Sequence, residues 1–260
     1  MNICVDVGNT EIKISFIRND KLINSMSVMT DSSKSEDEFF AIFERQLKVK
    51  NIELDENNDL IYSSVVPSVN LNLKNALKRL FKPGFSIDLG GKVKTSLPMK
   101  VDNPSEVGSD LIADVVGAKV KYFAPCLVID LGTASKILLL DKDGFFSSAT
   151  IIPGIKISMD ILANKGELLP NINLEMPNKV VARNTIDAMK VGVVYGHLEM
   201  IKGLVEKYTQ EIGYQPQVVL TGGYSVIYKD YMGEKWIYDP NLLAIGLNFI
   251  LTRNKEFKNV

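Results

Sequence analysis

The residues with the clearest chemical potential lie near the start of the chain, where an apolar run leads into Asp-Val-Gly-Asn-Thr at residues 6–10. Gly8 has no Cβ, so backbone N–H groups and the Thr10 hydroxyl could approach a phosphate closely. Asp6, at the expected end of a strand, is placed to hold Mg²⁺ through water beside a nucleotide. The alternative is an ordinary strand followed by a turn that contains asparagine.

The same arrangement occurs a second time. Apolar residues 126–129 lead into Asp-Leu-Gly-Thr-Ala at residues 130–134. In both places an apolar run ends in Asp, and one apolar residue, a Gly and a polar residue follow. Repetition of one supersecondary unit predicts two related lobes that face each other, with a ligand between them.

Composition limits the class of protein. With 260 residues, of which 46% are hydrophobic, the chain can bury a large core as two similar-sized lobes or one large α/β domain. Lys and Arg number 30 against 31 Asp and Glu, which leaves a net charge of −1 and predicts no basic surface for nucleic acid. We also expect no membrane span and no signal peptide, and therefore a cytoplasmic protein.

Cysteine and histidine usage points away from a metal centre built by the protein. Cys4 and Cys126 both lie in apolar, strand-like runs, so we expect buried free thiols rather than a disulfide. His197 is the single histidine, and there is no cysteine pair, which argues against a zinc site. We expect His197 to be a packing or surface residue rather than a catalyst.

Hydrophobic periodicity predicts the elements that must position these residues. The Asn and Thr at residues 184 and 185 are expected to start a long helix. The predicted strands are 2–8, 13–18, 21–29, 59–66, 85–89, 126–130, 137–140, 145–152 and 217–220. The predicted helices are 39–48, 67–80, 110–121, 155–164, 184–211 and 242–251.

Six short motifs, in their order along the chain, resemble the type III pantothenate kinases, which belong to the superfamily of acetate kinase, sugar kinases, heat-shock chaperones and actin. The resemblance extends from residue 2 to about residue 251, and the motifs lie at residues 6–10, 108–110, 130–134, 153–154, 184–185 and 221–223. It implies an α/β fold of two ribonuclease-H-like, actin-like ATPase lobes with the nucleotide cleft between them. The expected lobes are 1–115, to which a C-terminal helix at 240–255 could also belong, and 116–239.

The resemblance also implies an activity. The γ-phosphate of ATP would pass to the primary hydroxyl of pantothenate, the first step of coenzyme A biosynthesis. The enzyme would be a homodimer that needs Mg²⁺ and a monovalent cation, K⁺ or NH₄⁺. Asp110 would accept the hydroxyl proton, Asp130 would bind K⁺, and Asp6 would reach Mg²⁺ through water.

The same resemblance assigns the binding residues. Three of the residues assigned by the resemblance also have a structural explanation. Asp110 could be a carboxylate favoured by a helix dipole, Asp130 a turn residue at a strand end, and Thr185 a helix-cap or first-turn residue. The turn at residues 221–223 is similar to the adenosine-side turn of the superfamily. The expected ATP contacts are Asp6, Val7, Gly8, Asn9, Thr10, Glu11, Ile12, Lys13 and Thr133, and the expected pantothenate contacts are Gly108, Ser109, Asp110, Leu111 and Thr185.

Four departures from the family pattern bear mainly on the acceptor. Leu111 stands where the family usually has Arg, which would grip an anionic group through two hydrogen bonds. Losing such contacts could cost about 2–5 kcal/mol. The alternatives are therefore a kinase of another small hydroxylated metabolite, or a non-catalytic nucleotide-binding accessory or regulatory homologue. The other departures are Val101 for a Tyr, Ser135 and Lys136 for a Thr pair, and Ser148 and Ala149 for two glycines.

Overall fold

The computed structural model describes residues 1–90, 93–166, 169–170, 172–233 and 235–258. These residues pack as two compact units. Unit 1 comprises Met1–Leu97, Asn103–Val120 and the described part of Leu242–Val260, and unit 2 comprises Pro98–Asp102 and Lys121–Asn241. The boundary expected at 115/116 falls inside a helix, and the chain returns to unit 1 for its last helix.

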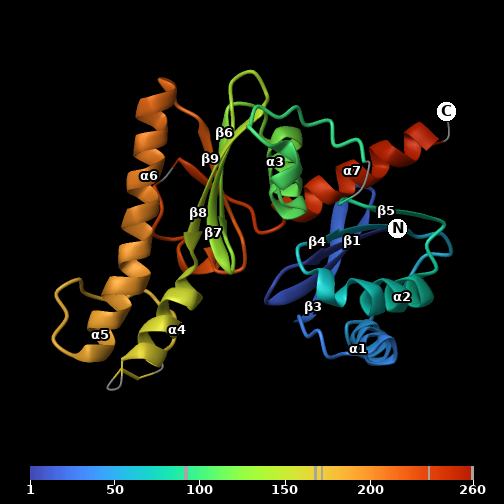
Figure 1. Cartoon of the computed structure of the whole chain (residues 1–260), viewed down its shortest axis with the longest axis horizontal. Coiled ribbons are helices and arrows are strands. Elements are labelled where there is room, and N and C mark those ends of the chain that lie inside the picture. Colours follow the sequence, from blue (N-terminus) through green and yellow to red (C-terminus); the bar gives the residue numbers. More distant parts are fainter. Residues whose placement is uncertain (91–92, 167–168, 171, 234, 259–260) are drawn as a thin grey trace. The chain divides into compact units, whose positions relative to one another are not determined.

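Unit 1 is built on a five-stranded mixed sheet in the order β3-β2-β1-β4-β5 (Figure 1). Three antiparallel strands come first in the chain, and two parallel strands follow on the other side of β1. All five were predicted, although β2 begins two residues earlier than expected. The strands are β1 (Asn2–Val7), β2 (Glu11–Arg18), β3 (Lys21–Met29), β4 (Asp59–Ser64) and β5 (Phe85–Asp88).

One face of this sheet is covered by helices α1 (Glu36–Val49) and α2 (Asn70–Phe81). Alternate residues of β1 point toward these helices, as the two-residue period of a strand requires. Ser35 and Glu38 form a capping box that starts α1. The buried residues that form this core include Ile3, Val5, Val7, Ile14 and Phe16 of the sheet and Phe39, Phe43, Leu73, Leu77 and Phe81 of the helices.

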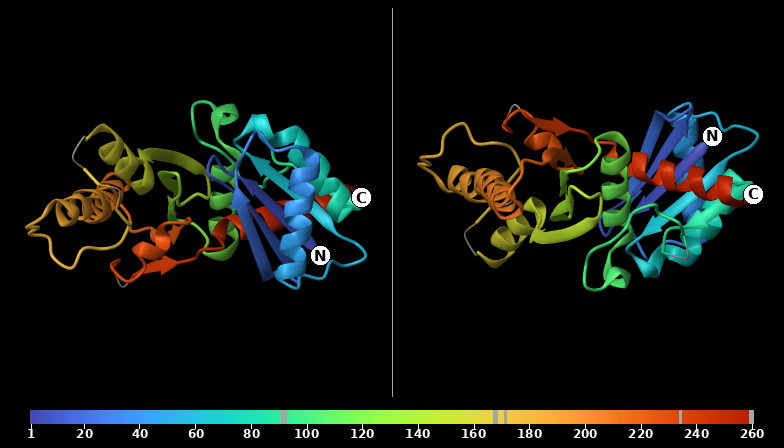
Figure 2. Two further views of the ribbon diagram at one scale, coloured as in Figure 1. Left: turned by 90° about the horizontal axis from the view of Figure 1, so that it is seen from below. Right: turned by 90° about the horizontal axis from the view of Figure 1, so that it is seen from above.

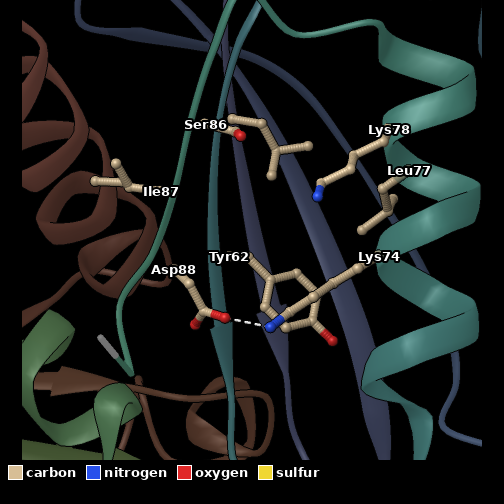
Figure 3. A pocket seen from close by; sticks show the side chains of 8 residues that line it. Tyr62, Lys74, Leu77, Lys78, Ser86, Ile87 and Asp88 are labelled. Atoms are coloured by element: carbon tan, nitrogen blue, oxygen red, sulfur yellow. Dashed lines mark hydrogen bonds and ion pairs between the residues drawn. The ribbon is translucent and has the colours of Figure 1, made fainter. Parts of the chain in front are cut away.

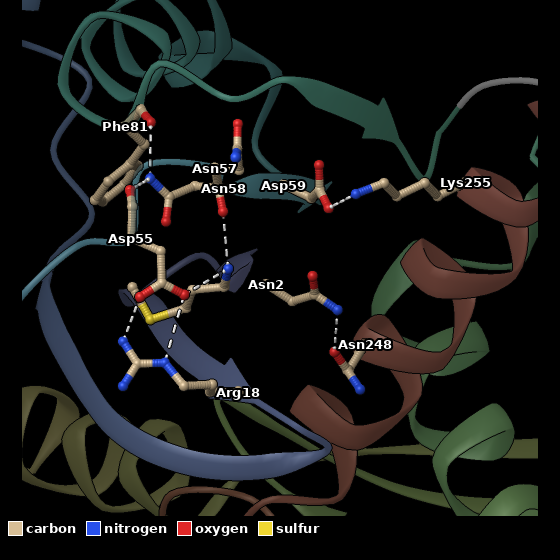
Figure 4. A network of polar contacts seen from close by, with 10 residues as sticks. Asn2, Arg18, Asp55, Asn57, Asn58, Asp59, Phe81, Asn248 and Lys255 are labelled. Atoms are coloured by element: carbon tan, nitrogen blue, oxygen red, sulfur yellow. Dashed lines mark hydrogen bonds and ion pairs between the residues drawn. The ribbon is translucent and has the colours of Figure 1, made fainter. Parts of the chain in front are cut away.

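Helices α7 (Leu242–Lys258) and α3 (Ser109–Lys121) complete unit 1. Helix α7 packs on β1, β4 and β5 and is held there by polar contacts, shown in Figure 4. Asn2 donates from Nδ2 to Oδ1 of Asn248 at 2.8 Å, and the Lys255 ammonium lies 2.5 Å from Asp59. Helices α3 and α7 approach closely, since a Cβ added to Gly246 would lie 1.8 Å from the Ala113 carbonyl oxygen.

Unit 2 repeats the topology of unit 1. Its sheet has the order β10-β9-β6-β7-β8, in which β6, β7 and β8 pair antiparallel and β9 and β10 follow in parallel beside β6. Strand β10 was not predicted, because three residues give no periodicity. The strands are β6 (Cys126–Leu131), β7 (Ala134–Leu140), β8 (Phe146–Pro153), β9 (Gln217–Thr221) and β10 (Trp236–Tyr238).

The helices of unit 2 cover one face of its sheet, as Figure 2 also shows. The long helix predicted at 184–211 consists of α5 (Thr185–Lys190), a π-helical segment (Val191–Tyr195) and α6 (Gly196–Ile212). Helix α4 (Ile155–Lys165) lies before them in the chain. Their core with the sheet contains Leu127, Ile129, Ile137, Leu220, Met159, Val194, Leu198 and Ile201.

Both cysteines are buried free thiols, as expected. Burial raises the pKa of Cys126 to about 12, and that of Cys4 still further. Both thiols therefore stay protonated at neutral pH and act as small apolar side chains. In the part of the chain that the structure describes, no helix combines the length and apolar character needed to span a membrane.

Candidate functional site

The first candidate phosphate turn joins β1 to β2 in unit 1. Asp6 is the next-to-last residue of β1 and lies opposite Lys13 of β2. Inside the turn, the N–H of Gly8 donates to the carbonyl oxygen of Glu11 at 3.0 Å. The register therefore places an acidic and a basic side chain on the same side of the hairpin, directly below a tight turn.

A third segment supports this turn. Thr30, which follows β3, donates from its hydroxyl to the Gly8 carbonyl oxygen at 2.7 Å. Its N–H also donates to the carbonyl oxygen of Thr10 at 3.0 Å. Asn9 and Thr10 are exposed. Thr30 thus holds the turn through two backbone carbonyl groups, while Asn9 and Thr10 face solvent.

The second candidate region is the start of α3, also in unit 1. The Ser63 hydroxyl donates to the Ser109 hydroxyl at 2.8 Å, and both residues are buried. Leu111 is also buried, at 8% exposed. Asp110 is less buried, and one carboxylate oxygen lies 2.5 Å from where a Cβ on Gly108 would stand. Among residues 108–111, the groups that a ligand could reach are therefore the Gly108 backbone and the Asp110 carboxylate.

In unit 2, three of the six motifs meet at the end of β6. The turn at residues 130–134 lies against Gly154, where a Cβ would stand 2.2 Å from the Thr133 carbonyl oxygen. It also lies against Gly222, where a Cβ would stand 2.4 Å from Oδ1 of Asp130. Gly222 has a φ of +93°, which residues other than glycine rarely adopt. Both glycines allow backbone to pack where a side chain would not fit.

Asp130 has a close basic partner. Lys136 of β7 lies opposite Asp130 of β6 and donates from Nζ to Oδ2 at 2.6 Å. The two side chains are only 15% and 10% exposed, respectively. The sequence identifies Lys136 as a departure from the family pattern but does not reveal this pairing. The signal that could have found it is the hairpin itself, because residues on either side of a tight turn stand opposite each other.

His197 packs inside unit 2, as expected, and is not part of the turn cluster described above. Its Nε2 lies 2.9 Å from the Ser135 hydroxyl oxygen, and both residues are buried. Burial lowers the pKa of His197 below its usual value. The imidazole is therefore neutral at pH 7.

Thr185 is the first residue of α5 and is exposed. The N-cap is Asn184, whose side-chain oxygen accepts from the N–H of Asp187 at 2.8 Å. The helix start does not depend on the Thr185 hydroxyl for its cap, so that hydroxyl stays a candidate contact for a ligand.

A separate pocket lies in unit 1 between α2 and strands β4 and β5 (Figure 3). Its lining includes Lys74 and Lys78, but Lys74 is ion-paired with Asp88 and lies over the ring of Tyr62. None of the residues expected to bind ATP or pantothenate lines this pocket. It is therefore not the predicted site.

Solved structures show that the chain has the actin-like ATPase fold. MreB 5 of Spiroplasma citri, solved with AMPPNP, matches 99% of this chain and 98% of its own with a TM-score of 0.54 and 13% identity. A conserved Campylobacter jejuni protein assigned to the Baf family of transcriptional activators matches 98% and 99% with a TM-score of 0.62 and 19% identity. At these identities the likeness establishes the fold alone.

Sequence comparison then defines the family. The family model of type III pantothenate kinase matches residues 2–207. Relatives that bear this name from Exiguobacterium sibiricum and Brevibacillus brevis are 33% and 34% identical over 98% of this chain and 100% of their own. The chain belongs to the type III pantothenate kinase family, and it is accordingly an ATP-dependent kinase.

The turn cluster of unit 2 predicts a sharp difference between two neighbouring glycines. Gly222→Ala should destabilise the protein by about 1–3 kcal/mol, because the new methyl group would overlap Asp130 and the backbone of Leu131. Gly223→Ala is the matched control, since nothing lies within 4 Å of its Cβ position. Urea denaturation measures both variants, and equal stability of the two would contradict the packing described.

The second prediction concerns the pH dependence of stability. Because the folded-state pKa of His197 is lowered, its contribution to stability is present above pH 6.5 and is lost as the pH falls through the folded pKa. Between pH 7.5 and pH 5.5 the wild type should lose more free energy of unfolding than His197→Gln. Since His197 is the single histidine, its imidazole NMR signal reports the pKa directly. A midpoint at or above 6.5 would contradict the assignment.

Proposed function

We propose that this kinase transfers the γ-phosphoryl group of ATP to the primary hydroxyl of pantothenate, using the residues assigned below. The observation that carries the proposal is the placement of the family motifs. Residues 6–10 form a supported turn after β1, and residues 130–134, 153–154 and 221–223 form one cluster after β6. In phosphoryl transfer the protein mainly positions the reactants and neutralises the charge of the phosphates, and rigid turns can do both.

On the phosphate side, residues 6–13 and Thr133 bind ATP. Asp6 offers the hard carboxylate oxygen that Mg²⁺ prefers and is partly exposed at the end of β1. Within the described ranges, no cluster of three or more His, Cys, Asp or Glu side chains could hold a metal ion. A magnesium ion would therefore be held mainly by phosphate oxygens and water, with Asp6 reached through water. When bound, it neutralises phosphate charge.

On the acceptor side, Asp110 is the catalytic residue. Its carboxylate takes the proton from the primary hydroxyl as the hydroxyl oxygen forms a bond to the γ-phosphorus. The bond from that phosphorus to the β,γ-bridging oxygen breaks, and ADP leaves with its electron pair. Asp110 lies in the first turn of α3, where a carboxylate complements the partial positive charge of the helix N-terminus. Gly108 and Thr185 contribute contacts to pantothenate.

Two of the assigned acceptor residues have a narrower role than the resemblance implies. The Ser109 hydroxyl already accepts a hydrogen bond from Ser63, and the Leu111 side chain is buried. Their contribution to pantothenate binding is then through backbone atoms. Leu111 also cannot grip the pantothenate carboxylate as an Arg would, so this chain must hold that group with other residues.

The contacts of Asp130 conflict with the binding of a monovalent cation there. The resemblance places K⁺ or NH₄⁺ on Asp130, but that carboxylate is already ion-paired with Lys136 at 2.6 Å. A second monovalent cation at the same carboxylate would be repelled by the ammonium. The side chains present therefore do not fit a K⁺ ion on Asp130.

The proposed assembly is a cytoplasmic homodimer. Beyond the family resemblance, its support lies on α4, where two large apolar side chains, Ile157 and Ile161, are exposed at i and i+4 of one helix face.

The test of the function is product formation. Purified protein with ATP, Mg²⁺, pantothenate and potassium chloride should form 4′-phosphopantothenate, detected by mass spectrometry. A folded protein that forms none above a no-enzyme control would overturn the proposal. A panel of other small hydroxylated metabolites, run in parallel, then separates a different acceptor from a protein that has no kinase activity.

The third prediction tests Asp110 as proton acceptor. Asp110→Asn should lower kcat by about 10²- to 10⁴-fold, because an amide cannot take the hydroxyl proton. ATP affinity, measured by isothermal titration calorimetry, should stay near that of the wild type. Asp143→Asn is the matched control, since Asp143 is exposed in the loop between β7 and β8. An unchanged rate in Asp110→Asn would remove Asp110 from the mechanism.

A further inference from the structure

We propose that the Lys136 ammonium takes the place of the monovalent cation, so that this kinase works without K⁺ or NH₄⁺. The inference rests on the proposed kinase function and deepens the account of the Asp130 turn. It concerns one side chain of this chain and the charge that it carries.

The register of the β6–β7 hairpin holds Lys136 beside Asp130. Lys136 and Asp130 are register partners in the β6–β7 hairpin, so their side chains leave the sheet on the same side. The ammonium reaches the carboxylate at 2.6 Å, a short charge-assisted hydrogen bond. The strands hold both ends of the contact, so the ammonium is a fixed part of the site.

The Lys136 ammonium resembles a monovalent cation in its chemistry. A lysine side chain ends in a substituted ammonium ion, a compact point charge with three donors. It carries the same charge as K⁺ and NH₄⁺, and its own hydrogen bonds replace part of a hydration shell. A tethered cation needs no binding from solution, so its occupancy does not depend on salt.

The ion pair of Lys136 and Asp130 is largely buried. The side chains of Lys136 and Asp130 are 15% and 10% exposed, so solvent and salt screen their attraction only weakly. Removing the lysine would leave a largely buried carboxylate at the centre of the turn cluster. Because such a charge needs a partner, Lys136→Thr should create a demand for a cation that the wild type lacks.

The experiment measures 4′-phosphopantothenate formation in choline, sodium, potassium and ammonium chlorides at equal ionic strength, with ATP supplied as its Tris salt. Wild-type rates should agree within about twofold across the salts. Lys136→Thr should be slow in choline or sodium and recover at least about tenfold in potassium or ammonium. Lys142→Thr, at an exposed lysine after β7, should behave as the wild type.

A second readout does not depend on turnover. The melting temperature of Lys136→Thr should rise in potassium relative to sodium chloride at equal ionic strength, whereas that of the wild type should not change. If the protein makes no product in any salt, the kinase function fails, and the melting temperatures still decide this inference. A Lys136→Thr protein that does not fold leaves the decision to the wild-type salt series.

Three results would overturn the inference. Wild-type activity that requires potassium or ammonium would show that the lysine does not replace the cation. Equal activity of Lys136→Thr in all salts would show that the turn needs no cation. A loss of activity that potassium does not restore, with weaker ATP binding, would make Lys136 a phosphate contact instead.

Discussion

A carboxylate near the end of the first strand of each sheet, facing a lysine on the next strand, is the constraint on which the candidate site depends. In unit 1 the pair of register positions is Asp6 and Lys13, and in unit 2 it is Asp130 and Lys136. Antiparallel pairing fixes which residues stand opposite, with their Cβ atoms about 5 Å apart, and opposite charges at such positions stabilise the sheet. The turn above each pair is therefore positioned by sheet register, which a loop alone could not provide.

The repeated topology explains why the same chemistry occurs twice. Both sheets consist of a three-stranded antiparallel meander extended by two parallel strands, with the Asp on the strand where the two parts meet. The two units differ in what supports the turn. In unit 1 the support is Thr30, whereas in unit 2 it is the close approach of Gly154 and Gly222. Small residues are needed where three backbone segments meet.

Much of this arrangement could be predicted from the sequence, because strand periodicity and the repeated motif are local signals. Strand β3 has the predicted bounds, and of the two residues predicted to cap the long helix, Asn184 is its N-cap. The π-helical interruption before α6 could not be predicted, since a 3.6-residue pattern runs through it unchanged. Strand β10 was missed because its pairing with β9 is a tertiary contact that three residues do not reveal.

The site shows the same division between local and tertiary information. The turn residues could be found from the motifs, and all the motif segments lie at strand or helix ends. The inward orientation of Ser109 depends on Ser63, which is 46 residues away, and the lysine partner of Asp130 depends on hairpin register. Periodicity and composition carry no information on either pairing.

Hydrogen–deuterium exchange tests the proposal that the turns after β1 and β6 both bind ATP. At saturating ATP and Mg²⁺, amide exchange should slow in peptides that cover residues 6–10 and 130–134. It should stay unchanged in the loop at residues 141–145, between β7 and β8. Unchanged exchange in either turn, under conditions where ATP binding is confirmed by calorimetry, would contradict the claim.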